Sequence, residues 1–309
     1  MSVLPDCVLA RVMRVEKVEP IEGARSIELY TVGGWTVVDK IGLYKEGDLV
    51  IHCMINSIFP DGNRIKTKKI LGVLSQGIIL PVGERDVKED DDLTQDLNLR
   101  KYVPPLEEHL YKEDEDKAPF PPFVPKTDEV RIQSCKKLLY KLDGVSCVIT
   151  EKRDGTSTTY IFCRDRFMVA GRNHVHLRPN STSRVYFEMA NGLEEKMRRM
   201  GRNLAIQGEI TGPRIGKNLH KLSRLKFHVF NVYSIDESRY LPWRDVIEIC
   251  EELGLQHVEV LHWGVIIKPT VEYFIGLADT QLEGIVVKTD EGPRVSFKCI
   301  SNLYLQRYE

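Results

Sequence analysis

A lysine at the end of an apolar strand is the residue in this sequence best suited to nucleophilic chemistry. Residues 151–157 read Glu-Lys-Arg-Asp-Gly-Thr-Ser, so Lys152 follows an apolar stretch and precedes a tight turn at Asp154-Gly155. That position exposes an amine close to a carboxylate. The pattern Lys-x-Asp-Gly is weak by itself, because a surface hairpin with a solvated lysine has the same letters.

Two acids and two further lysines stand at the ends of other apolar strands. They are Glu209, Glu283, Lys288 and Lys298. Each one alone is more typical of a structural surface charge. Together with Lys152 and Asp154 they supply what nucleotidyl transfer requires: a nitrogen nucleophile, carboxylates for a divalent cation, and cations around an α-phosphate.

The order of these motifs resembles that of the covalent nucleotidyltransferases, the superfamily of polynucleotide ligases and mRNA capping enzymes. The segments similar to its motifs I, Ia, III, IIIa, IV and V are residues 152–155, 171–173, 207–209, 227–230, 283–288 and 296–298. Within the superfamily, residues 125–133 and 208–218 resemble RNA ligases rather than capping enzymes. Only about eleven residues follow Lys298 and the barrel-like region comes first. That order resembles the nick-sealing RNA ligases of the Deinococcus and Naegleria type.

The resemblance implies an ATP-dependent RNA ligase acting on RNA or on a nicked duplex that contains RNA. Lys152 would attack the α-phosphorus of ATP, AMP would pass to an RNA 5′-phosphate, and a 3′-hydroxyl would displace it. The catalytic residues implied are Lys152, Lys288 and Lys298, of which the last two would contact the α-phosphate. The ligands implied for Mg²⁺ or Mn²⁺, directly or through water, are Asp154, Glu209 and Glu283.

The same resemblance implies a set of nucleotide-binding residues. They are Lys152, Arg172, Glu209, Phe230, Glu283, Lys288, Lys298, Gln133 and Arg131. Phe230 would stack on adenine, with Phe227 as the alternative. Residues three apart in a strand point to opposite faces, so at most one of these two rings should face the nucleotide. Ser296 stands where related RNA ligases have a lysine, and Arg294 is a candidate replacement.

Other functions share some of these features. A DNA ligase or a capping guanylyltransferase would carry similar motifs, and an OB protein with a degenerate transferase domain would bind nucleic acid without catalysis. Basic residues gather at 196–202 and 214–226. Either group would follow an RNA backbone or form an ordinary solvated face.

Composition narrows the class of protein. The 309 residues include 44 basic and 45 acidic side chains, so the net charge of −1 exerts no global attraction on nucleic acid. Seven scattered cysteines without a Cys-x-x-Cys pair argue against a zinc cluster or a disulfide framework. No apolar run suits a membrane span and no secretory signal is recognisable, so we expect an intracellular protein. We also expect a monomer.

Local patterns predict an α+β protein in two parts. Short strands over residues 8–82, with a hairpin turn at Gly33-Gly34, favour an OB-type β-barrel. An acidic, proline-containing extension follows over residues 84–120. Helices are predicted over residues 127–142, 183–200, 242–253 and 271–278, alternating with strands. The predicted domains are an OB-like barrel with its acidic linker, 1–120, and a nucleotidyltransferase domain of antiparallel sheets with flanking helices, 121–309.

Overall fold

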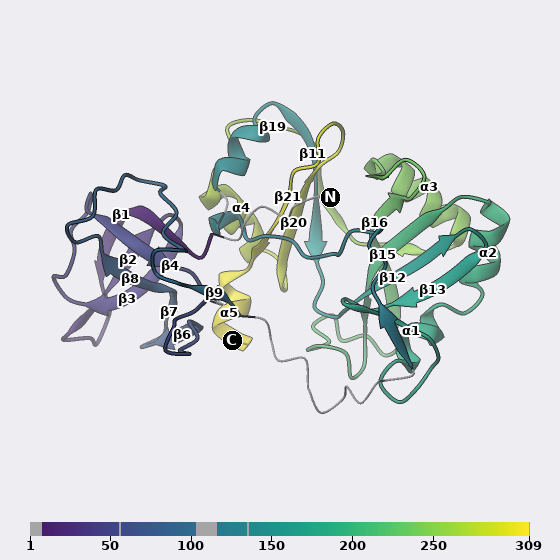
Figure 1. Cartoon of the computed structure of the whole chain (residues 1–309), viewed down its shortest axis with the longest axis horizontal. Helices are drawn as coiled ribbons and strands as arrows, with labels where there is room; N and C mark the ends of the chain where they lie inside the picture. The colour runs from purple at the N-terminus through teal and green to yellow at the C-terminus, as the bar shows by residue number, and fades with distance from the viewer. Residues whose placement is uncertain (1–7, 56, 103–115, 135, 309) are drawn as a thin grey trace. The chain divides into compact units, whose positions relative to one another are not determined.

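The computed structural model describes residues 8–55, 57–102, 116–134 and 136–308 (Figure 1). Contacts divide the chain into two compact units. The first comprises Met1–Glu108, Ile132–Lys136 and Asn302–Glu309, and the second comprises His109–Arg131 and Lys137–Ser301. The domain boundary expected between residues 120 and 121 stays a prediction, and part of the expected acidic linker, residues 103–115, lies outside the described residues.

The first unit is built on a curled antiparallel sheet of order β3-β2-β1-β4-β8. Its strands are β1 (Ala10–Pro20), β2 (Ile27–Val32), β3 (Trp35–Lys40), β4 (Leu49–Cys53) and β8 (Ile78–Pro81). The first half of β1 pairs with β4 and its second half pairs with β2, with a bulge between Val15 and Lys17. One long strand therefore belongs to both parts of the sheet, as the predicted OB-type fold requires.

Shorter elements complete this unit. They are β5 (Ser57–Ile58), β6 (Thr67–Ile70), β7 (Val73–Gln76), β9 (Arg100–Lys101), the 3₁₀ turn η2 (Ile132–Ser134) and helix α5 (Asn302–Tyr308). The predicted hairpin turn is confirmed: Gly33 and Gly34 have φ of +60° and +77°, and Val32 pairs with Trp35 across it.

The second unit holds two sheets. The larger sheet has the order β10-β14-β13-β12-β15-β16-β17, and β18 pairs with β16; the smaller has the order β19-β11-β20-β21. The larger sheet comprises β10 (Lys117–Pro119), β12 (Thr156–Cys163), β13 (Arg166–Ala170), β14 (His174–His176), β15 (Leu204–Thr211), β16 (Lys226–Ser234), β17 (Arg239–Tyr240) and β18 (Gln256–His257). The smaller sheet comprises β11 (Val145–Lys152), β19 (Val260–Ile266), β20 (Gly284–Thr289) and β21 (Ser296–Ile300).

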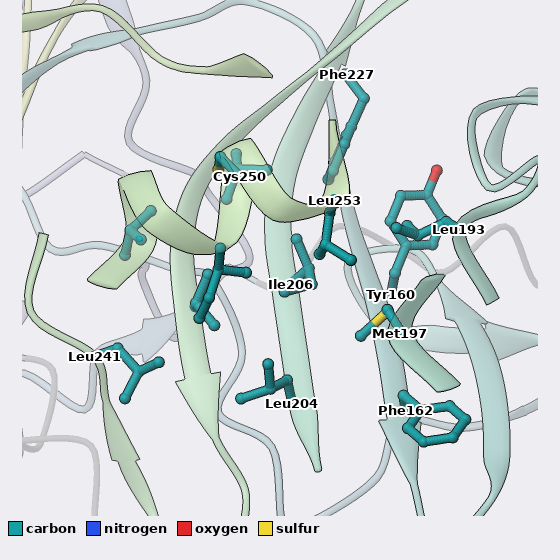
Figure 2. Close-up of a cluster of buried hydrophobic side chains, with 14 of the residues drawn as sticks. Tyr160, Phe162, Leu193, Met197, Leu204, Ile206, Phe227, Leu241, Cys250 and Leu253 are labelled. Carbon is teal, nitrogen blue, oxygen red and sulfur yellow. The ribbon is translucent and has the colours of Figure 1, made fainter. Parts of the chain in front are cut away.

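Helices cover one face of each sheet. The helices are α1 (Arg184–Met189), α2 (Leu193–Met200), α3 (Trp243–Leu253) and α4 (Val271–Asp279). Figure 2 shows side chains of α2 and α3, such as Met197 and Leu253, packed against Tyr160 and Ile206 from the larger sheet. On the smaller sheet, Phe274 of α4 packs edge-on against Phe297 of β21. The opposite face of the larger sheet carries a second apolar cluster that includes Ile161, Ala205 and Tyr233, whereas the opposite face of the smaller sheet carries Lys152 and Lys298.

Two of the predicted helices differ from the structure. The helix expected over 127–142 is absent from the described part of this segment, which contains only 3₁₀ turns, η2 and η3 (Lys136–Lys141). Residues 130 and 131 instead run beside β21, where the Val130 carbonyl accepts the Lys298 N–H at 2.8 Å, so long-range pairing overrides the local helical pattern. The helix expected over 183–200 is split at Gly192, which has φ of +72°.

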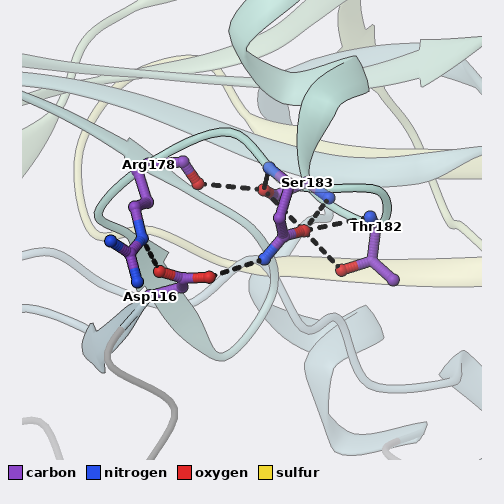
Figure 3. Close-up of polar contacts among 5 residues, drawn as sticks. Asp116, Arg178, Thr182 and Ser183 are labelled. Atoms are coloured by element: carbon purple, nitrogen blue, oxygen red, sulfur yellow. Dashed lines mark hydrogen bonds and ion pairs between the residues drawn. The ribbon is translucent and has the colours of Figure 1, made fainter.

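A polar cluster ties the start of β10 to the loop before α1 (Figure 3). The Asp116 carboxylate forms an ion pair with Arg178, which holds the pKa of Asp116 below its usual range, and it also accepts a hydrogen bond from Asn180. Asn180 Oδ1 accepts the backbone N–H groups of Thr182 and Ser183. These bonds fix the shape of the loop that leads into α1.

The described residues show the state of most cysteines and the length and polarity of the helices. Five cysteines there are free; they are Cys53, Cys147, Cys163, Cys250 and Cys299, whereas Cys7 and Cys135 lie outside the described residues. A bilayer could not be crossed by any helix in the described ranges, since each is too short or too polar.

Candidate active site

The polar face of the smaller sheet forms one wall of a cavity. Strand alternation places Thr150 and Lys152 of β11 on the same face, and β20 contributes Val286 and Lys288 beside them. Lys298 of β21 pairs with Val286 in register. The cationic residues found by sequence therefore share one face because they occur at even spacings in paired strands.

The larger sheet supplies the opposite wall. In β15, Leu204, Ile206 and Ile210 pack against the helices, so Glu209 points away from them. Gly155, in the turn after Lys152, lets this wall approach closely: a Cβ there would lie 2.3 Å from the Ile210 carbonyl oxygen. The Asp-Gly turn thus needs its glycine for packing beside Glu209.

The cavity between these walls has a volume of about 330 Å³. Eight of the ten site residues expected from sequence line it. They are Lys152, Asp154, Arg172, Glu209, Phe230, Glu283, Lys288 and Lys298. Arg131 does not line the cavity, but its backbone forms an isolated parallel β-bridge with that of Lys298. Gln133 is buried in η2, which groups with the first unit, so its expected contact with the nucleotide stays a prediction.

The Lys152 amine forms an ion pair with Glu283 at one end of the cavity. Both side chains are largely shielded from solvent, at 25% and 11% exposure. Burial raises the pKa of nearby Glu209 to about 8, with Glu283 and Asp154 adding to the rise and Lys152 opposing it. A nucleophile candidate and three carboxylates therefore meet at one place.

Two further cations border this end. Burial lowers the pKa of Lys298 to about 8, and the positive charges of Lys152 and Arg131 lower it further. Arg172 is more exposed and forms an ion pair with Asp128. Positive charge thus accumulates where an anionic group could lie beside the Lys152 amine.

Comparison with known proteins identifies the family. The RNA ligase family profile matches residues 145–300, and an OB-fold domain profile matches residues 9–63. A solved structure of a Naegleria gruberi RNA ligase mutant in the apo form is similar with a TM-score of 0.79 and 32% identity, covering 97% of this chain and 98% of that one. The chain belongs to the RNA ligase family.

Two more Naegleria gruberi RNA ligase structures are similar to this RNA ligase. A mutant with AMP and Mn gives a TM-score of 0.79, and the enzyme with PPi gives 0.78; each is 32% identical and covers 97% of this chain and 98% of its own. A search of curated proteins gave no match.

Lys288 lies at the other end of the cavity, which revises its expected role. Lys152 pairs with Gly284 but Lys288 pairs with Val148, so four residues, or ~13 Å of strand, separate the two lysines. The Lys288 amine is buried and donates to the Phe230 carbonyl and to Asn231 Oδ1. The expected contact of Lys288 with the α-phosphate beside Lys152 therefore has no support in this RNA ligase.

A β-bulge selects Phe230 rather than Phe227 as the aromatic residue of the cavity. Phe227 is buried in the core against Tyr160, with ring centroids 4.9 Å apart. Gly208 pairs with Val229 and Gln207 with Asn231, so Phe230 is an extra residue in β16. Bulges redirect side chains next to active sites, and this one turns Phe230 towards the cavity.

The sequence reasoning missed a polar network around Lys288. Asn231 Oδ1 also accepts from Arg294, at 3.3 Å, and its amide donates to Gln207 at 3.4 Å. Arg294 stacks on Tyr240, 3.8 Å from the ring centroid. Arg294 therefore lies at the Lys288 end of the cavity. Asn231, which directly follows motif IIIa, carries no sequence signal that distinguishes it from a core strand residue.

The three acids fit a hydrated divalent cation better than a bare one. Among the described residues, no group of three or more His, Cys, Asp or Glu side chains is arranged to hold a metal ion. However, Glu283 Oε2 is buried without a hydrogen-bond partner, and burial, with smaller contributions from Glu283 and Asp154, raises the pKa of Glu209. A cation that keeps part of its water shell would satisfy both groups.

Proposed function

We propose that this RNA ligase joins RNA 3′-hydroxyl and 5′-phosphate ends, at nicks in a duplex, through a covalent adenylate on Lys152. One observation carries the proposal: the Lys152 amine faces a cavity beside Glu283, with Glu209 and Lys298 as neighbours. The bound AMP, Mn and PPi of the Naegleria structures support ATP and a divalent cation as the partners of this chain too. We expect the enzyme to work inside the cell as a monomer.

In the first step, the Lys152 nitrogen attacks the α-phosphorus of ATP. A nitrogen–phosphorus bond forms, the bond to the oxygen bridging the α- and β-phosphates breaks, and pyrophosphate leaves with that electron pair. The amine must lose a proton to react, and the Glu283 carboxylate in contact with it is the nearest acceptor. Glu283 therefore both orients the Lys152 amine and accepts its proton.

The remaining cavity residues divide between the two ends of the nucleotide. Lys298 and Arg172 offset the negative charge that builds on the α-phosphate. Phe230 and Lys288, which lie farther along the cavity, hold the adenine end, where the ring stacks and the buried amine donates. Asp154, Glu209 and Glu283 would hold Mg²⁺ or Mn²⁺ through water, and this ion supplies charge neutralisation at the α-phosphate.

The later steps use the same cavity. An RNA 5′-phosphate oxygen attacks the adenylate phosphorus, which releases Lys152 and forms an RNA-adenylate. The 3′-hydroxyl then attacks the RNA 5′-phosphorus, and AMP leaves as the phosphodiester bond forms. Each step passes through a phosphorus centre with extra negative charge, so Lys298 serves all three.

The test combines adenylate formation with sealing. Full-length enzyme is incubated with labelled ATP or GTP and then supplied with nicked duplexes that contain RNA or DNA on each side of the nick. We expect label on the protein from ATP only, and sealing when the nick contains RNA. Lys152→Ala should lose both reactions, whereas the exposed-lysine control Lys141→Ala should keep both.

Other results would point to a different function. Label from GTP indicates a capping enzyme, and efficient sealing of all-DNA nicks indicates a DNA ligase. A Lys152→Ala variant with unchanged adenylation would refute the covalent mechanism. Unlabelled wild-type protein that still binds the duplex would indicate a nucleic-acid-binding protein.

A further inference from the structure

A segment rich in basic residues follows β15, the strand that carries Glu209, and leads into β16. We call residues 212–226, which include the first residue of β16, the basic loop. Its ionisable residues are Arg214, Lys217, His220, Lys221, Arg224 and Lys226, and it contains no acid. In a chain whose net charge is −1, this concentration of positive charge is a local feature that a polyanion can recognise.

The basic loop is attached to both sides of the proposed nucleophile. Asp154 Oδ2 accepts the backbone N–H of Lys217 at 2.6 Å, and Glu151 Oε1 pairs with His220 Nε2 at 2.8 Å. Asp154 and Glu151 flank Lys152 in the chain. Whatever the loop binds is therefore held close to the Lys152 end of the cavity.

Internal hydrogen bonds give the basic loop a defined shape. The Asn218 side chain accepts the Leu222 N–H at 2.9 Å and donates to the Leu222 carbonyl at 3.0 Å, and Ile215 N–H donates to Gly212 at 3.1 Å. A loop that is ordered before binding loses less entropy when a ligand docks. The shape is thus suited to binding and not only to linking two strands.

Three cations of the basic loop face solvent without a counter-charge. Arg214, Lys221 and Arg224 are exposed, and none of them forms an ion pair with a described acid. The other basic group expected to follow RNA, residues 196–202, differs. Arg198 pairs with Asp165 and Glu194, and Lys196 donates to the Leu253 carbonyl at 2.6 Å. Those two charges already have structural partners.

We propose that the basic loop binds the phosphate backbone of the RNA substrate next to the end being joined. This inference rests on the proposed RNA ligase function. Phosphate contacts by Arg214, Lys221 and Arg224 give affinity without reading sequence, as suits a surface that positions any RNA end. The attachments at Asp154 and Glu151 bring that backbone to Lys152.

The test measures RNA binding and adenylate transfer separately. Full-length enzyme carries Arg214→Asn, Lys221→Asn and Arg224→Asn together, because asparagine removes the charge and tolerates the left-handed φ of +66° at Arg214 and +50° at Lys221. The matched control replaces three exposed arginines elsewhere in the second unit with asparagine; they are Arg164, Arg166 and Arg244. Enzyme labelled with AMP from ATP is then titrated with a nicked RNA duplex across a salt series.

We expect the loop variant to form the adenylate with ATP alone but to bind RNA at least ~10-fold more weakly near 0.1 M salt, with a salt slope smaller by ~2 to 3. The control should stay within ~2-fold of wild type. A charge-conserving variant, Arg214→Lys with Lys221→Arg and Arg224→Lys, should restore binding. Wild-type affinity and salt slope in the asparagine loop variant would overturn the proposal.

The two proposals fail in different ways. Wild-type enzyme that binds RNA with the expected loop dependence but forms no adenylate would refute the ligase mechanism and leave the loop surface standing. Normal adenylation and sealing by the wild-type enzyme, together with wild-type RNA affinity of the asparagine loop variant, would refute the loop surface and leave the ligase mechanism standing.

Discussion

Lys288→Met should make the protein more stable near neutral pH while it lowers ligation activity. Lys288 is 5% exposed, and burial followed by the charge of Arg294 lowers its pKa from 10.5 to about 7. Below pH 7 the folded state must carry this ammonium in a poorly solvated place. At ~1.4 kcal/mol for each pH unit between the folded and unfolded pKa, the cost there is about 5 kcal/mol.

Methionine removes that charge and keeps most of the side-chain volume. The Phe230 carbonyl loses its Lys288 donor, which costs roughly 1–3 kcal/mol, whereas Asn231 keeps Arg294. The variant should therefore exceed wild type by roughly 2–4 kcal/mol at pH 6.5. Ligation should fall because the donor at the adenine end is gone.

The sign of the pH dependence is the sharper test. Between pH 7 and 10.5 the unfolded chain binds a proton at Lys288 that the folded chain does not, so wild-type stability rises with pH in that window. The advantage of the variant should shrink by ~1.4 kcal/mol per pH unit and be close to zero near pH 9.

Urea unfolding of wild type and variant at several pH values from 6.5 to 9.5 measures this difference. Lys141→Met, at an exposed lysine, is the matched control and should show a difference that does not change with pH. A Lys288→Met variant that is less stable than wild type at pH 6.5, by an amount independent of pH, would refute the reasoning.

Two further predictions concern packing and acid stability. Gly155→Ala places a Cβ 2.3 Å from the Ile210 carbonyl oxygen, so its free energy of unfolding in urea should fall by ~1–3 kcal/mol and its adenylation should be slower. The control Gly276→Ala, in helix α4 with open space around the glycine, should be more stable than wild type by ~1 kcal/mol. Equal stabilities of the two variants would contradict this prediction. Burial lowers the pKa of His52, which bonds the Gln76 carbonyl, from 6.5 to about 4. Between pH 6.5 and 4 only the unfolded chain binds a proton at this histidine, so the free energy of unfolding should fall by about 3 kcal/mol as the pH is lowered through this range. His52→Gln should make this decline less steep in urea titrations. An equally steep decline in the variant would count against a buried neutral histidine.

Much of this site follows from local chemistry in the chain. Lys152 before an Asp-Gly turn, and Glu283 at the start of an apolar strand, carry their signal within a few residues. The turn at Gly33-Gly34 is equally local, because two adjacent glycines readily adopt the positive φ angles that its hairpin requires. Alternation within paired strands is also readable, and it brings eight of the ten expected residues to one cavity.

Only the tertiary structure decided which end of the cavity each residue serves. Lys288 is four residues from the Lys152 end because of the β11–β20 register, and Phe230 faces the cavity because β16 has a bulge opposite β15. Residues 130 and 131 lie beside β21 in place of the expected helix. Register, bulges and long-range pairing depend on residues far apart in the chain, so the periodicity within one segment cannot encode them.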